Sequence, residues 1–226
     1  MSIRESIINF IIRGILRTLF RFDPSALKQV PLKGPMLLIT NHVSVFEGPF
    51  LYVYLRPRRT IALAKRQLWN NWFTRIMMET WKSIPVDRGM LDRKAMDQCF
   101  KVLKEGDFLC LAPEGTRSKE GKLKKGKAGT AYFSLREQVP VIPVVTMGFE
   151  AFPRNIRRLR RTPITIKVGI PFDVIPPPGR ITNDIRQEVT DEMMVHLADL
   201  MPESLQGYYA DHKREFRYTR NRKTSH

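Results

Sequence analysis

The sequence predicts a single α/β domain with a central, mostly parallel sheet flanked by helices, preceded by an amphipathic membrane-associated helix. Two observations support the domain. The chain has 226 residues without repeats or long linkers, and its apolar strand-like runs alternate with segments of helical periodicity. A chain of this length can bury a sizeable core, since domains commonly contain about 100–200 residues. Alternation of strands and helices is typical of a parallel sheet.

The N-terminal segment predicts a helix that lies in a membrane interface. At about 100° per residue, Arg13, Arg17 and Arg21 share one stripe, and isoleucine, leucine and phenylalanine occupy most of the other side. Arginines throughout, and no small-residue cleavage site, make it a poor membrane span and a poor signal peptide. The alternative is a helix that packs on its own domain. We divide the chain into an interface helix at 1–22, a domain at 23–205 and a basic tail at 206–226.

The domain begins after Asp23-Pro24, and its elements follow in order. Apolar runs predict strands at Met36–Thr40, Thr60–Ala64, Ser83–Val86, Asp107–Ala112, Val139–Gly148 and Ile164–Ile170. Helical periodicity predicts helices at Phe46–Leu55, Gln67–Trp81, Leu91–Glu105, Gly126–Leu135 and Asn183–Leu200. The helix at Leu91–Glu105 has a continuous apolar face, which places Cys99 in the core. Pro143, within a strand, is expected at a sheet edge or bulge.

The composition is strongly basic, with 39 Lys+Arg against 22 Asp+Glu and a formal net charge of +17. Such a balance predicts an anionic partner: nucleic acid, an acidic membrane surface or a phosphorylated substrate. The last twenty residues interleave aromatic and basic side chains, which suits RNA or lipid headgroups, or simply a solvated end. Two cysteines, Cys99 and Cys110, and four scattered histidines predict neither a disulfide framework nor a metal site.

Two short motifs carry the predicted chemistry. Asn41-His42-x4-Glu47 follows the first predicted strand, at the carboxyl end where ligands bind in open α/β sheets. Imidazole is the natural general base near neutral pH and works best when a carboxylate holds its other nitrogen. The second motif is Pro-Glu-Gly-Thr-Arg-Ser at 113–118, followed by several lysines. An arginine beside a tight turn can bind phosphate through two hydrogen bonds.

Two further blocks complete a pattern: Arg88 after an extended run, and the proline-bearing apolar strand at Val139–Val144. Alone, each block has an ordinary explanation, such as a core histidine or a solvated loop. In this order, the four blocks resemble the glycerolipid acyltransferase family typified by bacterial 1-acyl-glycerol-3-phosphate acyltransferase. The third block, Glu114 to Ser118, matches without change. The likeness extends over Pro31–Pro171.

The resemblance implies that His42 removes a proton from a lysophospholipid hydroxyl while Glu47 orients the ring. It implies that Arg88, Arg117 and Lys65 hold the acceptor's phosphate. The other expected substrate-binding positions are Glu114, Gly115, Thr116 and Pro143. The acyl donor is acyl-CoA or an acyl carrier protein, and the expected reaction converts 1-acyl-glycerol-3-phosphate to phosphatidic acid. No cofactor, metal or covalent acyl-enzyme is expected. The protein is expected at the cytoplasmic face of the cell membrane as a peripheral, monotopic protein.

Three alternatives remain open at this point. The same chemistry can act on lysophosphatidylethanolamine or a lyso-aminolipid. The family usually carries aspartate where this chain has Glu47, which allows a weakly active member and predicts that Glu47→Asp keeps or raises activity. A non-catalytic basic protein that binds membranes or nucleic acid would depend on the tail, whereas an acyltransferase would keep most of its chemistry without residues 207–226. A serine hydrolase is disfavoured because the chain has no Gly-x-Ser-x-Gly motif.

Overall fold

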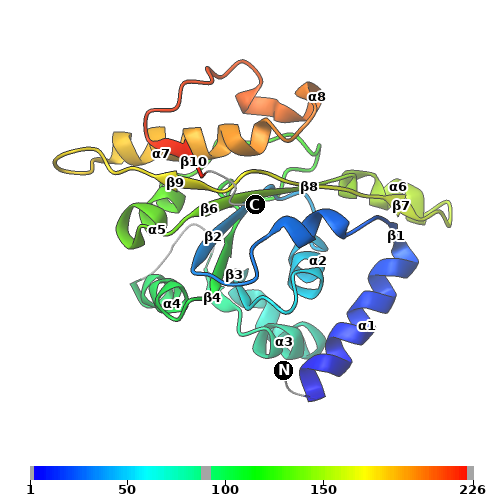
Figure 1. Cartoon of the computed structure of the whole chain (residues 1–226). Coiled ribbons are helices and arrows are strands. Elements are labelled where there is room, and N and C mark those ends of the chain that lie inside the picture. Colours follow the sequence, from blue (N-terminus) through cyan, green and yellow to red (C-terminus); the bar gives the residue numbers. More distant parts are fainter. Residues whose placement is uncertain (1–2, 88–92, 223–226) are drawn as a thin grey trace.

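The computed structural model describes residues 3–87 and 93–222, which form a central sheet with helices on both faces (Figure 1). Within these ranges the main sheet has eight strands in the order β10-β9-β6-β2-β5-β3-β4, with β8 also paired to β6. The strands are β2 (Met36–Thr40), β3 (Thr60–Lys65), β4 (Ile84–Val86), β5 (Phe108–Leu111), β6 (Val141–Met147), β8 (Thr165–Val168), β9 (Phe172–Val174) and β10 (Thr219–Asn221).

The centre of the sheet is parallel: β4, β3, β5, β2 and β6 run in one direction. β8, β9 and β10 add antiparallel pairs at one side. The central strands are continuously apolar because both of their faces are buried. In β2, Leu37 and Ile39 pack into the core on one face, and Met36 and Leu38 into the core on the other. The predicted α/β class is therefore confirmed, and the parallel strands end at one common edge.

Two groups of helices cover the sheet (Figure 1). One face carries α1 (Ile3–Leu19), α2 (Glu47–Tyr54) and α3 (Trp72–Thr80); the other carries α4 (Arg93–Lys104), α5 (Gly129–Glu137) and α7 (Asn183–Ala198). Shorter helices are η1 (Ser25–Gln29), η2 (Arg66–Asn70), η3 (Phe149–Ala151), α6 (Phe152–Ile156), α8 (Glu203–Gln206) and η4 (Gly207–Tyr209). Cys99 of α4 is fully buried, as its helical position predicts.

The predicted helix at 67–81 is divided at Asn71. This residue is extended (φ −103°, ψ 132°), and its side-chain oxygen accepts the N–H groups of Phe73 and Thr74. Asparagine is a favoured N-cap because its short side chain replaces a missing backbone partner. The chain therefore forms a 3-10 turn before Asn71 and a separate helix, α3, after it.

Pro143 lies in an interior strand, not at an edge. Strand β6 pairs with β2 on one side, while β9 and β8 pair with different parts of its other side, at Val141 and Val144. Pro143 falls at the interruption between β9 and β8, and its carbonyl accepts the N–H of Gly169 at 2.9 Å. A proline fits there because its missing N–H interrupts no ladder.

Helix α1 packs against the domain with one side and exposes apolar residues on the other. Ile12, Leu16 and the following Phe20 are buried, and Trp81 donates its indole N–H to the buried Asn9 side chain at 3.2 Å. Phe20 is fully buried, so the end of α1 packs into the core of the domain. The outward side exposes Ile3, Ile7, Phe10, Ile11 and Ile15. No helix in the described ranges has the length and hydropathy needed to cross a membrane.

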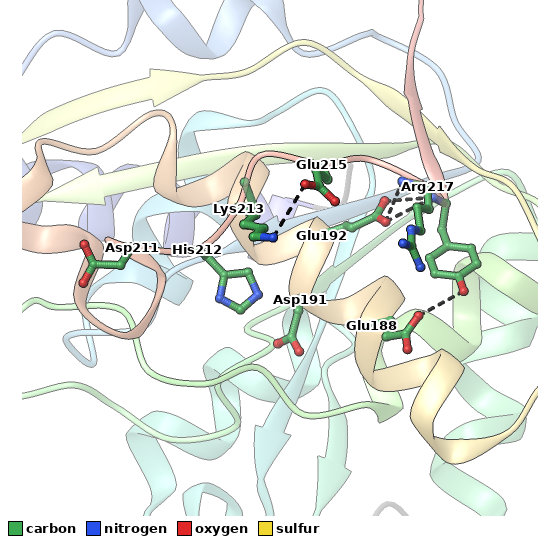
Figure 2. A pocket seen from close by; sticks show the side chains of 10 residues that line it. Glu188, Asp191, Glu192, Asp211, His212, Lys213, Glu215 and Arg217 are labelled. Carbon is green, nitrogen blue, oxygen red and sulfur yellow. Dashed lines mark hydrogen bonds and ion pairs between the residues drawn. The ribbon is translucent and has the colours of Figure 1, made fainter.

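The C-terminal segment, as far as residue 222, packs against the rest of the domain. Tyr209 is fully buried, with its hydroxyl bonded to Asp191 at 2.7 Å and to the N–H of Gly126 at 2.8 Å. Strand β10 extends the sheet beyond β9. Figure 2 shows the Glu192 carboxylate on α7, which accepts the backbone N–H groups of residues 217 and 218. The sequence pattern does not show this attachment because it depends on buried acceptors from a distant helix.

The hollow drawn in Figure 2 is separate from the predicted site. Its walls are α7 and the C-terminal segment, and its acidic side chains include Glu188, Asp191 and Asp211. None of the predicted catalytic or substrate-binding residues that the structure describes lines it. Lys213 and Glu215 pair across 4.0 Å at its rim.

Candidate active site

The predicted site residues gather at the carboxyl edge of the parallel strands. His42 lies two residues beyond β2, Glu114 three residues beyond β5, and Lys65 at the end of β3. Strand β5 pairs with both β2 and β3, so these three ends are neighbours along one edge. Ligands commonly bind at this edge in open α/β sheets, which agrees with the sequence-based prediction.

His42 and Glu47 form a close pair. The distance from His42 Nδ1 to Glu47 Oε2 is 2.8 Å, and the Val43 N–H donates to both carboxylate oxygens at 2.8 and 2.9 Å. Glu47 is the first residue of α2, where the helix N-terminus favours a negative charge. Its side chain is 2% exposed, whereas the His42 side chain is 34% exposed. The carboxylate thus holds one ring nitrogen inside, and the ring still reaches solvent.

Burial sets the electrostatics of this pair. Removal from water raises the pKa of Glu47, and the hydrogen bond from His42 acts in the opposite direction. A proton on Nδ1 of His42 satisfies the buried carboxylate, which leaves Nε2 as the basic nitrogen. When Nε2 accepts a second proton, the resulting imidazolium lies beside a negative charge that has little competing solvent. This arrangement suits a general base.

The loop at 113–118 holds the backbone of His42. One carboxylate oxygen of Glu114 accepts the His42 N–H at 2.9 Å, and the other accepts the Lys124 N–H at 3.0 Å. The Ser118 N–H donates to the His42 carbonyl at 2.7 Å. Glu114 is 2% exposed, and burial raises the pKa of its carboxyl group. Each of its oxygens therefore accepts a backbone N–H group within the fold, and these two bonds hold His42 and Lys124 in place.

The next three residues turn outward. Gly115 has φ +64°, and a Cβ there would lie 3.0 Å from the side chain of Lys127, so glycine suits both the conformation and the space. Thr116 and Arg117 are exposed. The Lys124 ammonium donates to the Arg117 carbonyl at 2.8 Å, which braces the turn. Arg117 directly precedes Ser118, whose N–H binds the His42 carbonyl. The backbone of Arg117 therefore lies close to that of His42.

The remaining predicted residues differ in placement. Lys65 is exposed and available at the shared edge. Pro143 is buried opposite Ile39 of β2, with little surface for a substrate, so its role lies in the sheet. Arg88 lies outside the described residues, two positions beyond the end of β4.

Sequence reasoning assigned no role to Asn41, which the structure identifies as a positioning residue. Its amide N–H donates to the Thr146 carbonyl at 2.9 Å, and its amide oxygen accepts the Thr146 N–H at 3.0 Å. These bonds join the ends of β2 and β6 directly before His42. The one sequence feature that pointed to Asn41 is its position next to His42 in the motif. No group of three or more His, Cys, Asp or Glu side chains in residues 3–87 and 93–222 could hold a metal ion.

A model of the acyltransferase family matches residues 21–147. The chain belongs to the acyltransferase family. The matched segment contains the His42–Glu47 pair and the whole 113–118 loop, so the family assignment and the site geometry concern the same part of the molecule. These are also two of the four blocks on which the resemblance to the family was based in the sequence.

Curated relatives of this chain include proteins named 1-acyl-sn-glycerol-3-phosphate acyltransferase. The protein from Cocos nucifera is 29% identical over 176 residues, which cover 74% of this chain and 54% of the relative. The human enzyme named 1-acyl-sn-glycerol-3-phosphate acyltransferase beta is 28% identical over 167 residues, covering 72% of this chain and 58% of the relative. The chain therefore spans about half the length of these relatives.

The fold also matches a solved structure. The 1-acyl-sn-glycerophosphate (LPA) acyltransferase PlsC from Thermotoga maritima superposes with a TM-score of 0.60 and 21% sequence identity. The match covers 88% of this chain and 82% of that chain. The two proteins share the fold of a helix-flanked, mostly parallel sheet.

Proposed function

We propose that the protein transfers a fatty acyl group from an acyl thioester to the free hydroxyl of a lysophospholipid, converting 1-acyl-glycerol-3-phosphate to phosphatidic acid. One observation carries this proposal: His42 is paired with buried Glu47 through its ring and held by Glu114 and Ser118 through its backbone. The names of the curated relatives support the same reaction.

The proposed reaction uses His42 first as a base and then as an acid. Nε2 of His42 takes the proton from the acceptor hydroxyl, whose oxygen attacks the thioester carbonyl carbon. The new C–O bond forms a tetrahedral intermediate, and its collapse breaks the C–S bond. The leaving thiolate then receives the proton from the imidazolium, so the ring returns to its starting state. Glu47 stabilises the imidazolium and keeps Nδ1 protonated throughout.

The acceptor's phosphate is proposed to bind the cations at the same sheet edge. Arg117 is exposed on a turn fixed beside His42, and a guanidinium matches phosphate geometry with two parallel hydrogen bonds. Lys65 and Arg88, at and after the ends of β3 and β4, are the further proposed contacts. Thr116 and the N–H groups near Gly115 are close enough in sequence to complete this anion site.

We place the protein at a membrane surface, as a peripheral protein on the cytoplasmic face. The exposed side of α1 supports this location, since Ile3 and Phe10 are 81% and 79% exposed. Trp72, at the start of α3, is 73% exposed. Large apolar side chains that protrude from a basic surface are typical of interfacial binding. The lipid acceptor is then available without leaving the bilayer.

Thiol release from palmitoyl-CoA by the purified protein in detergent tests the reaction. Release that requires 1-acyl-glycerol-3-phosphate and disappears in His42→Ala would support both the reaction and its base. His212→Ala is the matched control, because this histidine lies in the C-terminal segment outside the site. Release without an acceptor would contradict acyl transfer and indicate a thioesterase.

Acceptor and donor are separated by the same assay. Rates with lysophosphatidylethanolamine or a lyso-aminolipid above the rate with 1-acyl-glycerol-3-phosphate would replace the proposed acceptor. Release that occurs only from acyl carrier protein would establish the carrier as the donor. Absence of product with every donor and acceptor would contradict the proposed function.

A further inference from the structure

The turn between α6 and β7 (Thr162–Pro163) carries a dense positive charge that the proposed reaction does not use. Residues 154–161, here named the arginine loop, read Arg-Asn-Ile-Arg-Arg-Leu-Arg-Arg, and no acidic residue occurs between 151 and 172. All five arginines are exposed. Among the described residues, no ion pair within 4.0 Å joins any of the five to a carboxylate.

Leu159 stands at the tip of the arginine loop. Its side chain is 93% exposed, and its backbone has φ +51°, a left-handed conformation that favours glycine or asparagine over leucine. The turn is nevertheless ordered, because the N–H groups of Leu159 and Arg160 donate to the carbonyls of Ile156 and Asn155 at 3.0 Å. Neither solvation nor backbone preference explains a leucine at this tip, whereas contact with an apolar phase does.

The arginine loop is fastened to the end of α1. The guanidinium of Arg161 donates to the carbonyl of Phe20 at 2.7 and 3.2 Å, and the N–H of Ile164 donates to the carbonyl of Arg21 at 2.9 Å. Strands β1 (Phe20–Arg21) and β7 pair in parallel. Figure 1 shows α6, β7 and the C-terminal end of α1 gathered at one side of the molecule. The C-terminal end of α1 therefore lies beside the loop.

An aromatic cluster connects this region to the catalytic pair. Phe152 of α6 lies 4.9 Å from Phe46 and 5.3 Å from Phe20 between ring centroids, and Phe46 directly precedes Glu47. Helix α6 also follows the carboxyl end of β6, the strand end that Asn41 joins to β2. The arginine loop thus lies off the same sheet edge as His42.

We propose that the arginine loop binds an anionic phospholipid surface, with Leu159 inserted below the headgroups and the surrounding arginines bonded to lipid phosphates. The loop combines one apolar tip with flanking cations, which is the pattern of interfacial membrane contacts. Single-stranded nucleic acid, by contrast, is usually held by exposed aromatic side chains, and the loop exposes none. The contact would hold the catalytic edge of the sheet against the bilayer that supplies the acceptor.

This inference rests on the membrane location within the proposed function, but its test does not need catalysis. The full chain is sedimented with vesicles of phosphatidylcholine, with and without phosphatidylglycerol. The charge variant replaces Arg157, Arg158 and Arg160 by glutamine. Its matched control replaces Arg93, Lys94 and Lys104 of α4, which are also exposed, by glutamine. The apolar variant is Leu159→Asn, and its control is Leu32→Asn, at a leucine that is 67% exposed elsewhere.

The charge variant should lose affinity only for the anionic vesicles, by roughly 10²-fold at low salt, since each basic side chain near such a surface contributes roughly fivefold. Leu159→Asn should weaken binding roughly tenfold without lowering Tm, because asparagine tolerates the left-handed backbone. Both controls should bind as the wild type does.

Equal vesicle binding by the charge variant and its α4 control would overturn the inference. So would equal binding of the wild type to vesicles with and without phosphatidylglycerol. Unchanged vesicle binding with lost binding of a single-stranded oligonucleotide would assign the loop to nucleic acid instead. Failure of the proposed reaction appears separately, as absent thiol release in detergent, and leaves the vesicle result standing.

Discussion

The length of the Glu47 side chain matches the loop that carries it. Its Oε2 lies 2.8 Å from His42 Nδ1, and both oxygens lie within 2.9 Å of the Val43 N. Aspartate at the same Cα would hold its carboxylate about 1.5 Å further back, one C–C bond shorter. The distance to Nδ1 would then be about 4 Å, beyond hydrogen-bonding range. We therefore expect Glu47→Asp to lower kcat/KM, which reverses the expectation drawn from the family's usual aspartate.

The size of the loss follows from the bond that is broken. A hydrogen bond to a charged group contributes about 1.5–3 kcal/mol, and about 1.4 kcal/mol corresponds to a tenfold rate change, so Glu47→Asp should cost on the order of 10–10²-fold. Glu47→Gln should cost more, roughly 10³–10⁴-fold. An amide has only one acceptor oxygen, so it either opposes the Val43 N–H with its own NH₂ group or donates to Nδ1 and protonates the wrong ring nitrogen.

Initial rates of acceptor-dependent thiol release from palmitoyl-CoA measure these losses. Glu203→Asp, on the exposed helix α8, is the matched control and should retain wild-type kcat/KM. Thermal melting by circular dichroism separates activity from folding. Glu47→Gln removes a charge that burial disfavours but also opposes the Val43 N–H with an NH₂ group, so its activity is compared only if the variant still melts cooperatively.

Two results would refute this reasoning. Wild-type kcat/KM in Glu47→Asp would show that the loop adapts to the shorter side chain, so that its length carries no information. More than about a tenth of wild-type activity in a folded Glu47→Gln protein would show that the carboxylate does not determine which ring nitrogen is basic.

Three further predictions concern the support of the site and the fold. Glu114→Gln should lower kcat by about 10-fold or more with little change in KM. The amide has only one acceptor oxygen, so either the His42 N–H or the Lys124 N–H loses its acceptor and the backbone of His42 is held less firmly. A change confined to KM would indicate a substrate contact. Deletion of residues 206–226 should abolish cooperative unfolding. Loss of the buried ring of Tyr209 alone lowers the free energy of unfolding by about 3–5 kcal/mol, a large part of a domain's total stability. A soluble, active truncated protein would contradict this prediction. Burial lowers the pKa of His196 from 6.5 to about 4, so the unfolded chain binds a proton that the folded chain does not. Stability should therefore fall by about 3 kcal/mol as pH falls from 6.5 to about 4. His196→Gln should flatten that part of the Tm profile, and an unchanged profile would exclude His196 as the cause.

The parallel strands of the sheet and the residues of the candidate site were predicted from local sequence, whereas β9 and β10 were not predicted. The strand at Met36–Thr40 has the predicted bounds because a continuous apolar run can only be buried on both faces. His42, Glu47 and the 113–118 loop were identified by motif and by their places after strands. The division at Asn71 was not predicted, because a single capping side chain outweighs the helical periodicity around it.

Contacts between distant segments were not accessible in the same way. The assignment of Glu114 to substrate followed from its motif, but its carboxylate is closed off by the N–H groups of His42 and Lys124, which are 72 and 10 residues away along the chain. The C-terminal segment has the composition of a solvated tail, yet Tyr209 lies in the core. The composition of a segment does not show whether it is buried. Burial depends on the hydrogen-bond partners and apolar surface that other elements place beside it.

The sequence by itself determined the fold class and the parallel strands, and it predicted the chemical groups of the candidate site, because periodicity and motif are local properties. Only the tertiary structure decided how those groups are used. It assigned Glu114 and Asn41 to hold His42, matched the length of Glu47 to its loop, and joined the arginine loop to the end of α1. These outcomes depend on hydrogen bonds between segments far apart in the chain, and their geometry exists only once the sheet has brought those segments together.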